Sequence, residues 1–249
     1  MKDTIEIQSF APSTTLAPFV ESFWMIQNHG DRNEEVITFP DGGIDLYFFH
    51  NKEFSLHTSL VGLETHSQLG SMPKHSKLFG VRLKLLAAEY LLNSSVAEWV
   101  NNKTTLPHNF AGICENDLRN FDFFCEKLAH YLSSQLTQSP DSRKLIMSEL
   151  LYASHGAISV SEVSAKSHWS SRQINRYFNK WLGLPLKTYC DILRFSNSFE
   201  SLKMGLLFPE EGFTDQSHYI KLIKKYSNLT PKQLAQGKND RFIQLSTVK

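Results

Sequence analysis

The sequence predicts an α+β protein: a small antiparallel β-rich N-terminal domain with flanking helices, followed by an all-α C-terminal domain. Short aromatic segments separated by turn signals fill residues 1–80, and helical periodicity replaces them from Leu85 onward. A break at residues 137–141 divides the helical part in two. Hydrophobic residues make up 41% of the 249, which is enough for packed cores and excludes general disorder.

The predicted strands come first along the chain. Five segments have the composition of strands: 22–27, 35–39, 44–50, 53–59 and 77–83. The Asp41-Gly42-Gly43 tract between the second and third predicts a turn, because glycine accepts a positive φ without a Cβ clash. These segments together predict a small antiparallel β unit.

Two helical stretches follow the strands. Leu85, Ala88, Leu91 and Leu92 share one helical face, and residues 116–136 are predicted to form a second helix. The second helix has an apolar stripe at alternating spacings of 3 and 4, formed by Leu118, Phe121, Cys125, Leu128 and Leu132. A stripe of about two heptads favours packing within the chain, and a dimer seam remains the alternative.

The domain boundary is predicted at Pro140, which ends one helix before the next begins. The predicted division is an N-terminal sensing or dimerisation domain over 1–136, a linker over 137–141, a C-terminal domain over 142–240 and a tail over 241–249. Charge follows a similar division. Residues 1–154 hold 12 Lys and Arg against 18 Asp and Glu, a net −6, whereas residues 155–249 hold 14 against 7, a net +7. The basic C-terminal part suggests a polyanion partner.

The C-terminal part begins with the pattern of a helix-turn-helix. Ser159 and Glu162 have the spacing of a capping box, so a short helix is expected from Ser159 to about residue 168. A second helix is expected from Ser170 to about Leu182, with Gly183 ending it in the left-handed conformation.

The helix after Ser170 has two opposed faces. Ile174, Phe178 and Trp181 form an apolar face, and Arg172, Asn175, Arg176 and Asn179 form a polar one. The apolar face must pack on the domain, which leaves guanidinium and amide groups projecting together. These groups suit the edges of bases in the major groove, although an ordinary solvated helix face has the same pattern.

A second polar-faced helix is expected after Asp215, which suits an N-cap. Tyr219, Leu222, Ile223 and Tyr226 are expected to face the core, and Ser217, Lys221, Lys224 and Lys225 to face solvent. A long connecting helix is predicted over residues 185–203, and Thr230-Pro231 opens a last one.

This C-terminal arrangement strongly resembles the DNA-binding domain of the AraC/XylS family of bacterial transcription regulators, over about residues 142–236. The resembling residues are Ser159-Val160-Ser161-Glu162-Val163, Trp169-Ser170-Ser171-Arg172-Gln173-Ile174-Asn175-Arg176-Tyr177-Phe178, Gly183-Leu184, Leu193-Arg194-Phe195, Gly212-Phe213-Thr214-Asp215-Gln216-Ser217-His218-Tyr219 and Leu229-Thr230-Pro231. In that family, two recognition helices enter successive major-groove segments on one face of double-stranded DNA.

The resemblance implies roles for individual residues. Base reading falls to Arg172, Asn175 and Arg176 in the first helix-turn-helix, and to Gln216, Ser217 and Lys221 in the second. Contacts to DNA phosphates fall to Ser171, Gln173, Lys180, His218, Lys224 and Lys225.

The sequence departs from the family pattern in three places. His168 occupies the turn position where a small residue is usual, and Ser164 and Ser167 replace apolar residues on the preceding helix. Only residues 203–211 separate Leu202 from Gly212, so the supporting helix usual in the family must be one or two turns at most. This shortening leaves open whether the second helix-turn-helix reads bases or mainly positions the chain on phosphates.

The N-terminal part resembles the small β-rich domain that some of these regulators carry. The resembling residues are Pro18-Phe19-Val20-Glu21-Ser22-Phe23-Trp24, Pro40-Asp41-Gly42-Gly43-Ile44-Asp45-Leu46 and Gly80-Val81-Arg82. In the family such domains bind small effectors, mediate dimerisation, or both. The candidate pocket residues are Trp24, Phe39, Tyr47 and Phe49, and the alternative is that they are simply core.

An enzyme is not expected. No HExxH, P-loop or Gly-x-Ser-x-Gly pattern occurs, and the ten histidines form no His-x-His pair, so neither a metal nor a cofactor is predicted. The three cysteines are expected to be reduced and buried. No apolar run approaches the roughly 20 residues of a transmembrane helix, and the N-terminus has no signal-peptide pattern, so the expected location is the cytoplasm.

The sequence therefore predicts a sequence-specific DNA-binding transcription regulator. Double-stranded DNA is the expected partner, and a small-molecule effector and a second copy of the chain are further candidates. The alternative is a small-molecule-binding or enzymatic β domain attached to a helical protein-interaction module. The operator, the effector and the choice between activator and repressor are not readable from the sequence.

Overall fold

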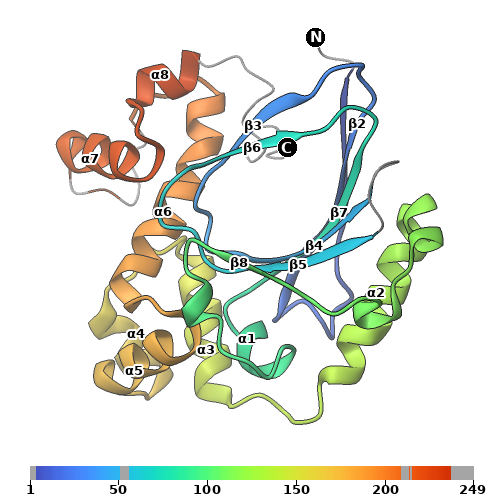
Figure 1. Ribbon diagram of the computed structural model, residues 1–249. Helices are drawn as coiled ribbons and strands as arrows, with labels where there is room; N and C mark the ends of the chain where they lie inside the picture. Colours follow the sequence, from blue (N-terminus) through green and yellow to red (C-terminus); the bar gives the residue numbers. More distant parts are fainter. Residues whose placement is uncertain (1–3, 51–55, 209–212, 214, 237–249) are drawn as a thin grey trace. The chain divides into compact units, whose positions relative to one another are not determined.

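The computed structural model describes residues 4–50, 56–208, 213 and 215–236, and within them the chain divides into two compact units (Figure 1). The sheet unit comprises residues 1–34, 43–63 and 71–140. The helical unit comprises residues 35–42, 64–70 and 141–249. The α+β class predicted from the sequence is confirmed: an antiparallel β domain precedes an all-helical region.

The sheet unit is built on six antiparallel strands in the order β1-β2-β7-β4-β5-β8. The strands are β1 (Ile5–Phe10), β2 (Val20–Asn28), β4 (Ile44–His50), β5 (His57–Val61), β7 (Lys77–Leu83) and β8 (Lys103–Thr105). Strands β4 and β7 coincide with the predicted segments 44–50 and 77–83. Strand β5 begins later than the predicted segment 53–59, part of which lies outside the described residues.

One face of this sheet carries the core of the unit. Helix α2 (Phe121–Gln135) packs there, with Phe124 fully buried and its ring 5.3 Å from that of Phe48 and 5.1 Å from that of Phe79. The stripe predicted along this helix is buried at Leu118, Cys125, Leu128 and Leu132 and half-buried at Phe121. The stripe therefore serves packing within the chain.

Other sequence expectations need correction in this unit. The predicted helix over 116–136 is two elements, the 3₁₀ helix η3 (Glu115–Arg119) and α2, because extended Asn120 interrupts them and caps α2 by accepting from the backbone N–H of Phe123. The helix predicted from Leu85 is a single turn, α1 (Ala87–Tyr90). Short 3₁₀ helices η1 (Ala97–Trp99) and η2 (Phe110–Gly112) lie in the connections.

Cys125 and Cys190 are buried as predicted, but Cys114 is exposed.

The predicted turn at Asp41-Gly42-Gly43 does not join a hairpin. Strand β3 (Glu34–Thr38) pairs with β6 (Gln68–Met72), which the sequence did not predict, whereas β4 pairs with β5 and β7. Gly42 has a φ of 82°, so its conformation is the one glycine favours. The two-stranded β3-β6 sheet belongs largely to the helical unit, since that unit includes residues 35–42 and 64–70.

The helical unit contains α3 (Ser142–Ala153), α4 (Val160–Ser167), α5 (Ser171–Leu182), α6 (Leu186–Lys203), α7 (Gln216–Ser227) and α8 (Pro231–Gln236). Helix α6 is the longest and has nine buried residues: Leu186, Tyr189, Cys190, Ile192, Leu193, Phe195, Ser198, Phe199 and Leu202. It packs against α5, α7 and α8, so it forms the core around which the unit is built. No described helix has the length and apolar character needed to cross a bilayer.

The first helix of this unit starts with a charged cap. The Asp141 carboxylate accepts from the backbone N–H of Arg143 at 2.9 Å and pairs with the Arg143 guanidinium at 2.6 Å. The hydrogen bond from the Arg143 side chain is the main cause that lowers the pKa of Asp141 from 3.8 to about 2. Ionised Asp141 thus stabilises the start of α3.

We expect Asp141→Ala to lower the free energy of unfolding by about 0.5–2 kcal/mol, because the helix loses its N-cap. The folded-state pKa lies below the unfolded one, so this contribution is complete above the unfolded value of 3.8 and disappears as the pH falls through about 2. Urea unfolding followed by circular dichroism should show the free energies of unfolding of the wild-type and Asp141→Ala proteins converging from pH 5 towards pH 2. A constant difference over that range would contradict the assignment.

Candidate nucleic-acid interface

The first candidate element is the pair α4 and α5, whose ends the sequence predicted well. Ser159 and Glu162 form a complete capping box at α4, and Ser170 and Gln173 form another at α5. Gly183 ends α5 with a φ of 74°. Between the helices, His168 adopts a φ of 53°, a left-handed conformation that glycine adopts at lower cost. The turn therefore forms despite the unusual residue.

The departures on α4 also have a structural explanation. Ser167 is fully buried, and its hydroxyl donates to the backbone carbonyl of Val163 at 2.6 Å, so its polar group is satisfied within the helix. Ser164 is half-buried. Val163 is the one hydrophobic residue that α4 buries completely, so the apolar contact of this helix is small.

Helix α5 has the two predicted faces. Ile174, Phe178 and Leu182 are fully buried and Tyr177 is nearly so, which anchors one side of the helix in the unit. The exposed side carries Arg172, Gln173, Arg176, Asn179 and Lys180. Trp181, expected on the apolar face, is half-buried and has the Lys180 ammonium 4.7 Å from its ring centre. Arg172 and Arg176, four residues apart, therefore extend from the same side of the helix.

Asn175 behaves differently from its two arginine neighbours. Its Nδ2 donates to the backbone carbonyl of Ser171 at 3.0 Å, and its Oδ1 accepts from the backbone N–H of Leu186 at 3.2 Å. Leu186 is the first residue of α6, whose N-cap is Pro185 and provides no side-chain hydrogen bond. The Asn175 amide therefore satisfies an otherwise orphan N–H of α6 and joins α5 to it. Sequence reasoning placed it among the base-reading residues.

Two other residues of the first helix-turn-helix are also engaged within the protein. The Gln173 Oε1 accepts from both the backbone N–H and the hydroxyl of Ser170, at 3.1 and 2.7 Å. Ser171 is half-buried in the first turn of α5. Both residues lie at the N-terminal end of the helix, where backbone N–H groups favour an anion.

Helix α7 is the second polar-faced helix. Asp215 caps it by accepting from the backbone N–H of His218 at 2.7 Å, as the sequence predicted. The predicted core residues Tyr219, Leu222, Ile223 and Tyr226 are all buried. Gln216, Ser217, Lys221, Lys224 and Lys225 are exposed. The predicted division of this helix into an apolar and a basic face is thus confirmed.

Two predicted phosphate contacts on α7 have partners within the helical unit. The Lys225 ammonium lies 3.7 Å from the Asp191 carboxylate of α6 and 4.6 Å from the centre of the Tyr226 ring. Its side chain is nevertheless 53% exposed, which leaves it able to turn towards solvent. His218 is half-buried, and its ring packs edge-to-face on Phe213 at 6.0 Å. Lys221 and Lys224 are exposed lysines of α7 and, unlike Lys225, do not lie beside Asp191.

The shortened connection before α7 contains no helix in its described part. Residues 204–208 form turns and bends, and residues 209–212 and 214 lie outside the described part of the chain. Phe213 and Phe208 pack their rings on Tyr219, at 4.8 and 5.9 Å. Aromatic contacts thus brace α7 where a supporting helix was expected to do so.

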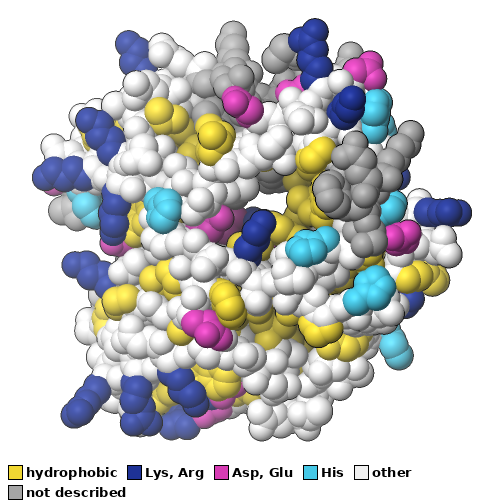
Figure 2. Space-filling view, viewed as in Figure 1, with side chains coloured by type: hydrophobic (Ala, Val, Ile, Leu, Met, Phe, Trp, Pro, Cys, Tyr) yellow, Lys and Arg dark blue, Asp and Glu magenta, His cyan; other side chains and the backbone are white. Residues whose placement is uncertain are grey.

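Figure 2 shows lysine and arginine side chains gathered along the side of the molecule where α4, α5 and α7 lie in Figure 1. The exposed basic residues of these three helices include Lys166, Arg172, Arg176, Lys180, Lys221 and Lys224. Both polar faces are thus strongly cationic.

A second candidate site lies on the sheet unit, on the face opposite α2. Trp24 and Tyr47 flank Gly80 in the β2-β7-β4 register, and their rings meet edge-to-face at 5.2 Å. A Cβ at Gly80 would lie 2.3 Å from the Trp24 indole, so only glycine allows this packing. Phe49 belongs to the same face as Tyr47 because it lies two residues along β4. Three of the four predicted pocket residues are thus together.

Phe39, the fourth predicted pocket residue, is not on this face. It belongs to the helical unit, where its ring packs on Phe195 and Phe199 at 6.0 and 5.5 Å. It packs in the helical unit because the strand before it pairs with β6 and not with the six-stranded sheet. The assignment of Phe39 to an effector pocket stays a prediction.

Sequence reasoning missed a partly buried ion pair beside the aromatic residues. The Arg82 guanidinium donates to both oxygens of Asp45, at 3.2 and 3.0 Å, and the indole N–H of Trp24 donates to the same carboxylate at 3.4 Å. The side chains are 20% and 8% exposed. The sequence contained a signal for this pair, since Asp45 and Arg82 are the charged residues inside strands that are otherwise apolar apart from His50 and Lys77 at their ends. This face therefore combines aromatic rings with a fixed cation and anion.

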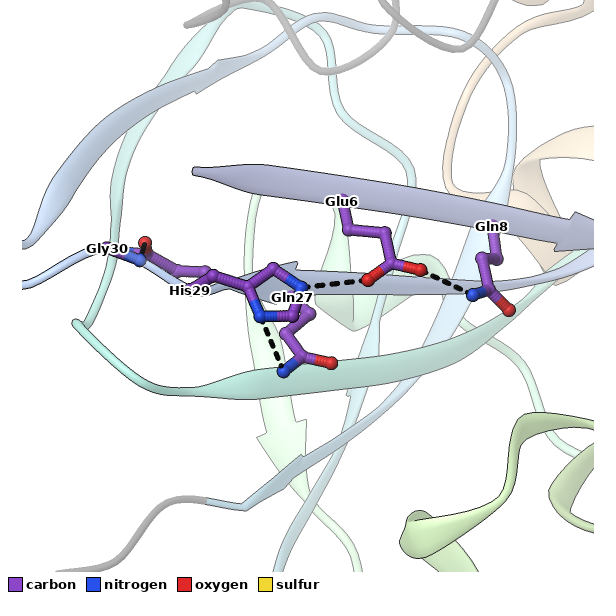
Figure 3. Close-up of polar contacts among 6 residues, drawn as sticks. Glu6, Gln8, Gln27, His29 and Gly30 are labelled. Atoms are coloured by element: carbon purple, nitrogen blue, oxygen red, sulfur yellow. Dashed lines mark hydrogen bonds and ion pairs between the residues drawn. The ribbon is translucent and has the colours of Figure 1, made fainter. Parts of the chain in front are cut away.

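Polar side chains also cluster at the edge of the sheet unit, on β1 and β2 and just after β2 (Figure 3). The Glu6 carboxylate accepts from Gln8 at 2.6 Å and lies 2.8 Å from the His29 ring, which in turn meets the Gln27 amide at 3.2 Å. The hydrogen bonds from His29 and Gln8 lower the pKa of Glu6. Glu6 and His29 are more than 40% exposed, so the cluster is an open surface feature that ties the ends of two strands together.

The described residues contain no group of three or more His, Cys, Asp or Glu side chains placed to hold a metal. Burial raises the pKa of the Cys125 thiol to about 12 and that of Cys190 to about 11. Both thiols stay protonated at neutral pH and are poor nucleophiles.

Comparisons with known proteins give limited similarity. Residues 8–105 match a family model described as a domain of unknown function, DUF6597. No curated protein matches. Solved structures of ToxT from Vibrio cholerae match over nearly the full length of both chains. The ToxT structure from strain O395 is 9% identical, covers 93% of this chain and 97% of its own, and has a TM-score of 0.44.

Two further ToxT structures contain small molecules. Wild-type ToxT bound to an unsaturated fatty acid is 10% identical, with coverages of 94% and 97% and a TM-score of 0.41. ToxT bound to (E)-4-(8-methylnaphthalen-1-yl)but-3-enoic acid is 13% identical, with coverages of 94% and 98% and a TM-score of 0.40. Similarity this low does not transfer a function from one chain to the other.

We expect Asn175→Ala to lower the free energy of unfolding by about 1 kcal/mol, because the N–H of Leu186 loses its acceptor. Arg176→Ala, on the exposed face of the same helix, should change it by less than about 0.5 kcal/mol. Urea unfolding followed by circular dichroism measures both. Equal effects of the two substitutions would contradict the structural role of Asn175.

Proposed function

We propose that the chain is a sequence-specific regulator of transcription of the AraC/XylS type, which reads successive major-groove segments of double-stranded DNA with α5 and α7. The observation that carries this proposal is the pairing of faces on these two helices. Each helix buries an apolar face in the helical unit and exposes cationic and amide side chains on its opposite face. The resemblance of the sequence to that family supports the same assignment.

The chemistry of the exposed faces suits base edges. The Arg172 and Arg176 guanidiniums can each donate two hydrogen bonds to the O6 and N7 acceptors of guanine. On α7, the Gln216 amide matches the N6 and N7 groups of adenine, and Lys221 can donate to guanine. We assign base reading to these four residues together with Ser217.

Phosphate binding is assigned to residues around the two polar faces. Lys180 and Lys224 are exposed cations on α5 and α7, and Ser171 and Gln173 lie at the N-terminal end of α5. Lys225 can join them by leaving Asp191, and His218 lies in the first turn of α7. Asn175 is reassigned to holding α6, given its two hydrogen bonds within the helical unit.

We further propose that the sheet unit senses a small effector. Trp24, Tyr47 and Phe49 offer an apolar face, and the Asp45–Arg82 pair offers a polar group for orientation, as in many small-molecule sites. A regulator of this type would act in the cytoplasm, and a second copy of the chain is a further candidate partner.

DNA binding can be tested by gel shifts with duplexes selected from a random pool. Arg176→Ala should cost about 1–3 kcal/mol on the preferred duplex and relax the choice at one base pair. Lys224→Ala should weaken all duplexes alike and reduce the slope of log affinity against log salt by about 1. Lys103→Ala, an exposed lysine of β8, is the control and should change neither.

Two results would overturn the proposal. An equal loss on preferred and random duplexes for Arg176→Ala would remove its base-reading role. No retention of the wild-type protein on random duplex at low salt would favour the alternative, in which the helical unit serves protein contacts.

A further inference from the structure

Residues 39–42, which precede β4, form part of the helical unit although about 100 residues separate them from its helices in sequence. We name them the contact segment. Phe39 is 1% exposed, and its ring packs on Phe195 and Phe199 of α6. The contact segment therefore supplies an aromatic residue to the core of the unit that carries the candidate nucleic-acid interface.

The other end of the contact segment meets α6 at Tyr189, six residues before Phe195. The Tyr189 hydroxyl donates to the backbone carbonyl of Gly42 at 3.0 Å, and the Tyr152 hydroxyl lies 2.8 Å from that of Tyr189. A Cβ on Gly42 would lie 3.1 Å from the Leu193 side chain. With its positive φ and this close approach, Gly42 fits against α6 as few other residues could.

The residues of α6 that hold the contact segment also hold the two polar-faced helices. The Tyr189 ring packs edge-to-face on Phe178 of α5 at 5.3 Å. The Phe195 ring packs on Tyr226 of α7 at 5.3 Å. In each of these aromatic pairs, the residue from α6 is also one that the contact segment touches: Tyr189 bonds to Gly42, and Phe195 packs on Phe39.

We propose that the contact segment is a positioning element of DNA recognition: through Tyr189 and Phe195 of α6 it fixes the placement of α5 relative to α7. This inference rests on the proposed function and adds to it a residue, Phe39, that lies outside both helix-turn-helix sequences. A substitution at Phe39 should therefore weaken the preference for one spacing between the two groove segments. It should leave intact the contacts that α5 and α7 each make with their own segment.

The test compares Phe39→Leu with Phe124→Leu in the full chain. Both changes remove a fully buried ring and keep an aliphatic side chain, but Phe124 packs on the six-stranded sheet and does not belong to the helical unit. Gel shifts would use the preferred duplex, the same duplex with one base pair inserted between the two segments, and a duplex with the first segment only.

Phe39→Leu should lower the ratio of affinities for the preferred and inserted duplexes towards one, with the affinity for the single-segment duplex unchanged. Phe124→Leu should keep the wild-type ratio even where it lowers the melting temperature. A wild-type ratio in Phe39→Leu, or an equal fall in both variants, would overturn the proposal.

A second measurement does not depend on DNA. Hydrogen–deuterium exchange of the free full chain should be faster in α6 and α7 for Phe39→Leu and Tyr189→Phe than for Phe124→Leu and Tyr152→Phe, since Tyr152→Phe retains the bond to Gly42. Equal exchange in all four variants would refute the positioning role. Faster exchange in a protein that binds no duplex would instead refute the proposed function and leave the contact segment as a brace of α6.

Discussion

Burial of the aromatic residues along α6 is the constraint on which the helical unit depends. Tyr189, Phe195 and Phe199 are at most 1% exposed and meet rings from α5, α7 and the β3-β4 connection. Most of the stability of a helix within a protein comes from the packing of its apolar face, so these contacts are what hold α6 in place. The polar faces of α5 and α7 are exposed because the apolar faces of both helices pack on α6.

Charge is arranged to complement that packing. Among the described residues of the C-terminal part, Arg143 pairs with Asp141, Arg194 pairs with Asp191 in α6, and Lys225 shares the Asp191 carboxylate. Lys221, Lys224, Arg172 and Arg176 remain exposed. The sheet unit shows the opposite arrangement at Asp45 and Arg82, where two largely buried charges pair with each other and the Trp24 indole donates to the same carboxylate.

Sequence reasoning succeeded where structure is determined locally. The caps at Ser159, Ser170 and Asp215 and the termination at Gly183 depend on residues within one turn, and all four are present as predicted. Strand β6 was missed because its sequence, Gln-Leu-Gly-Ser-Met, has no β-branched residue. The location of Phe39 and the hydrogen bond from the Leu186 N–H to Asn175 are set by tertiary packing, which periodicity in a single sequence does not encode.

The route of the chain between the two units has a consequence for how the molecule can be made. The backbone passes from one unit to the other five times, after residues 34, 42, 63, 70 and 140. During synthesis Phe39 leaves the ribosome long before Phe195 and Phe199. Its side chain therefore cannot be buried against them until most of the polypeptide has been made. A fragment starting at residue 141 would lack both strands of the small sheet. The two units are in this sense interleaved along the sequence, and a helical unit separated from the sheet unit would leave uncovered the side of α6 on which Phe39 packs.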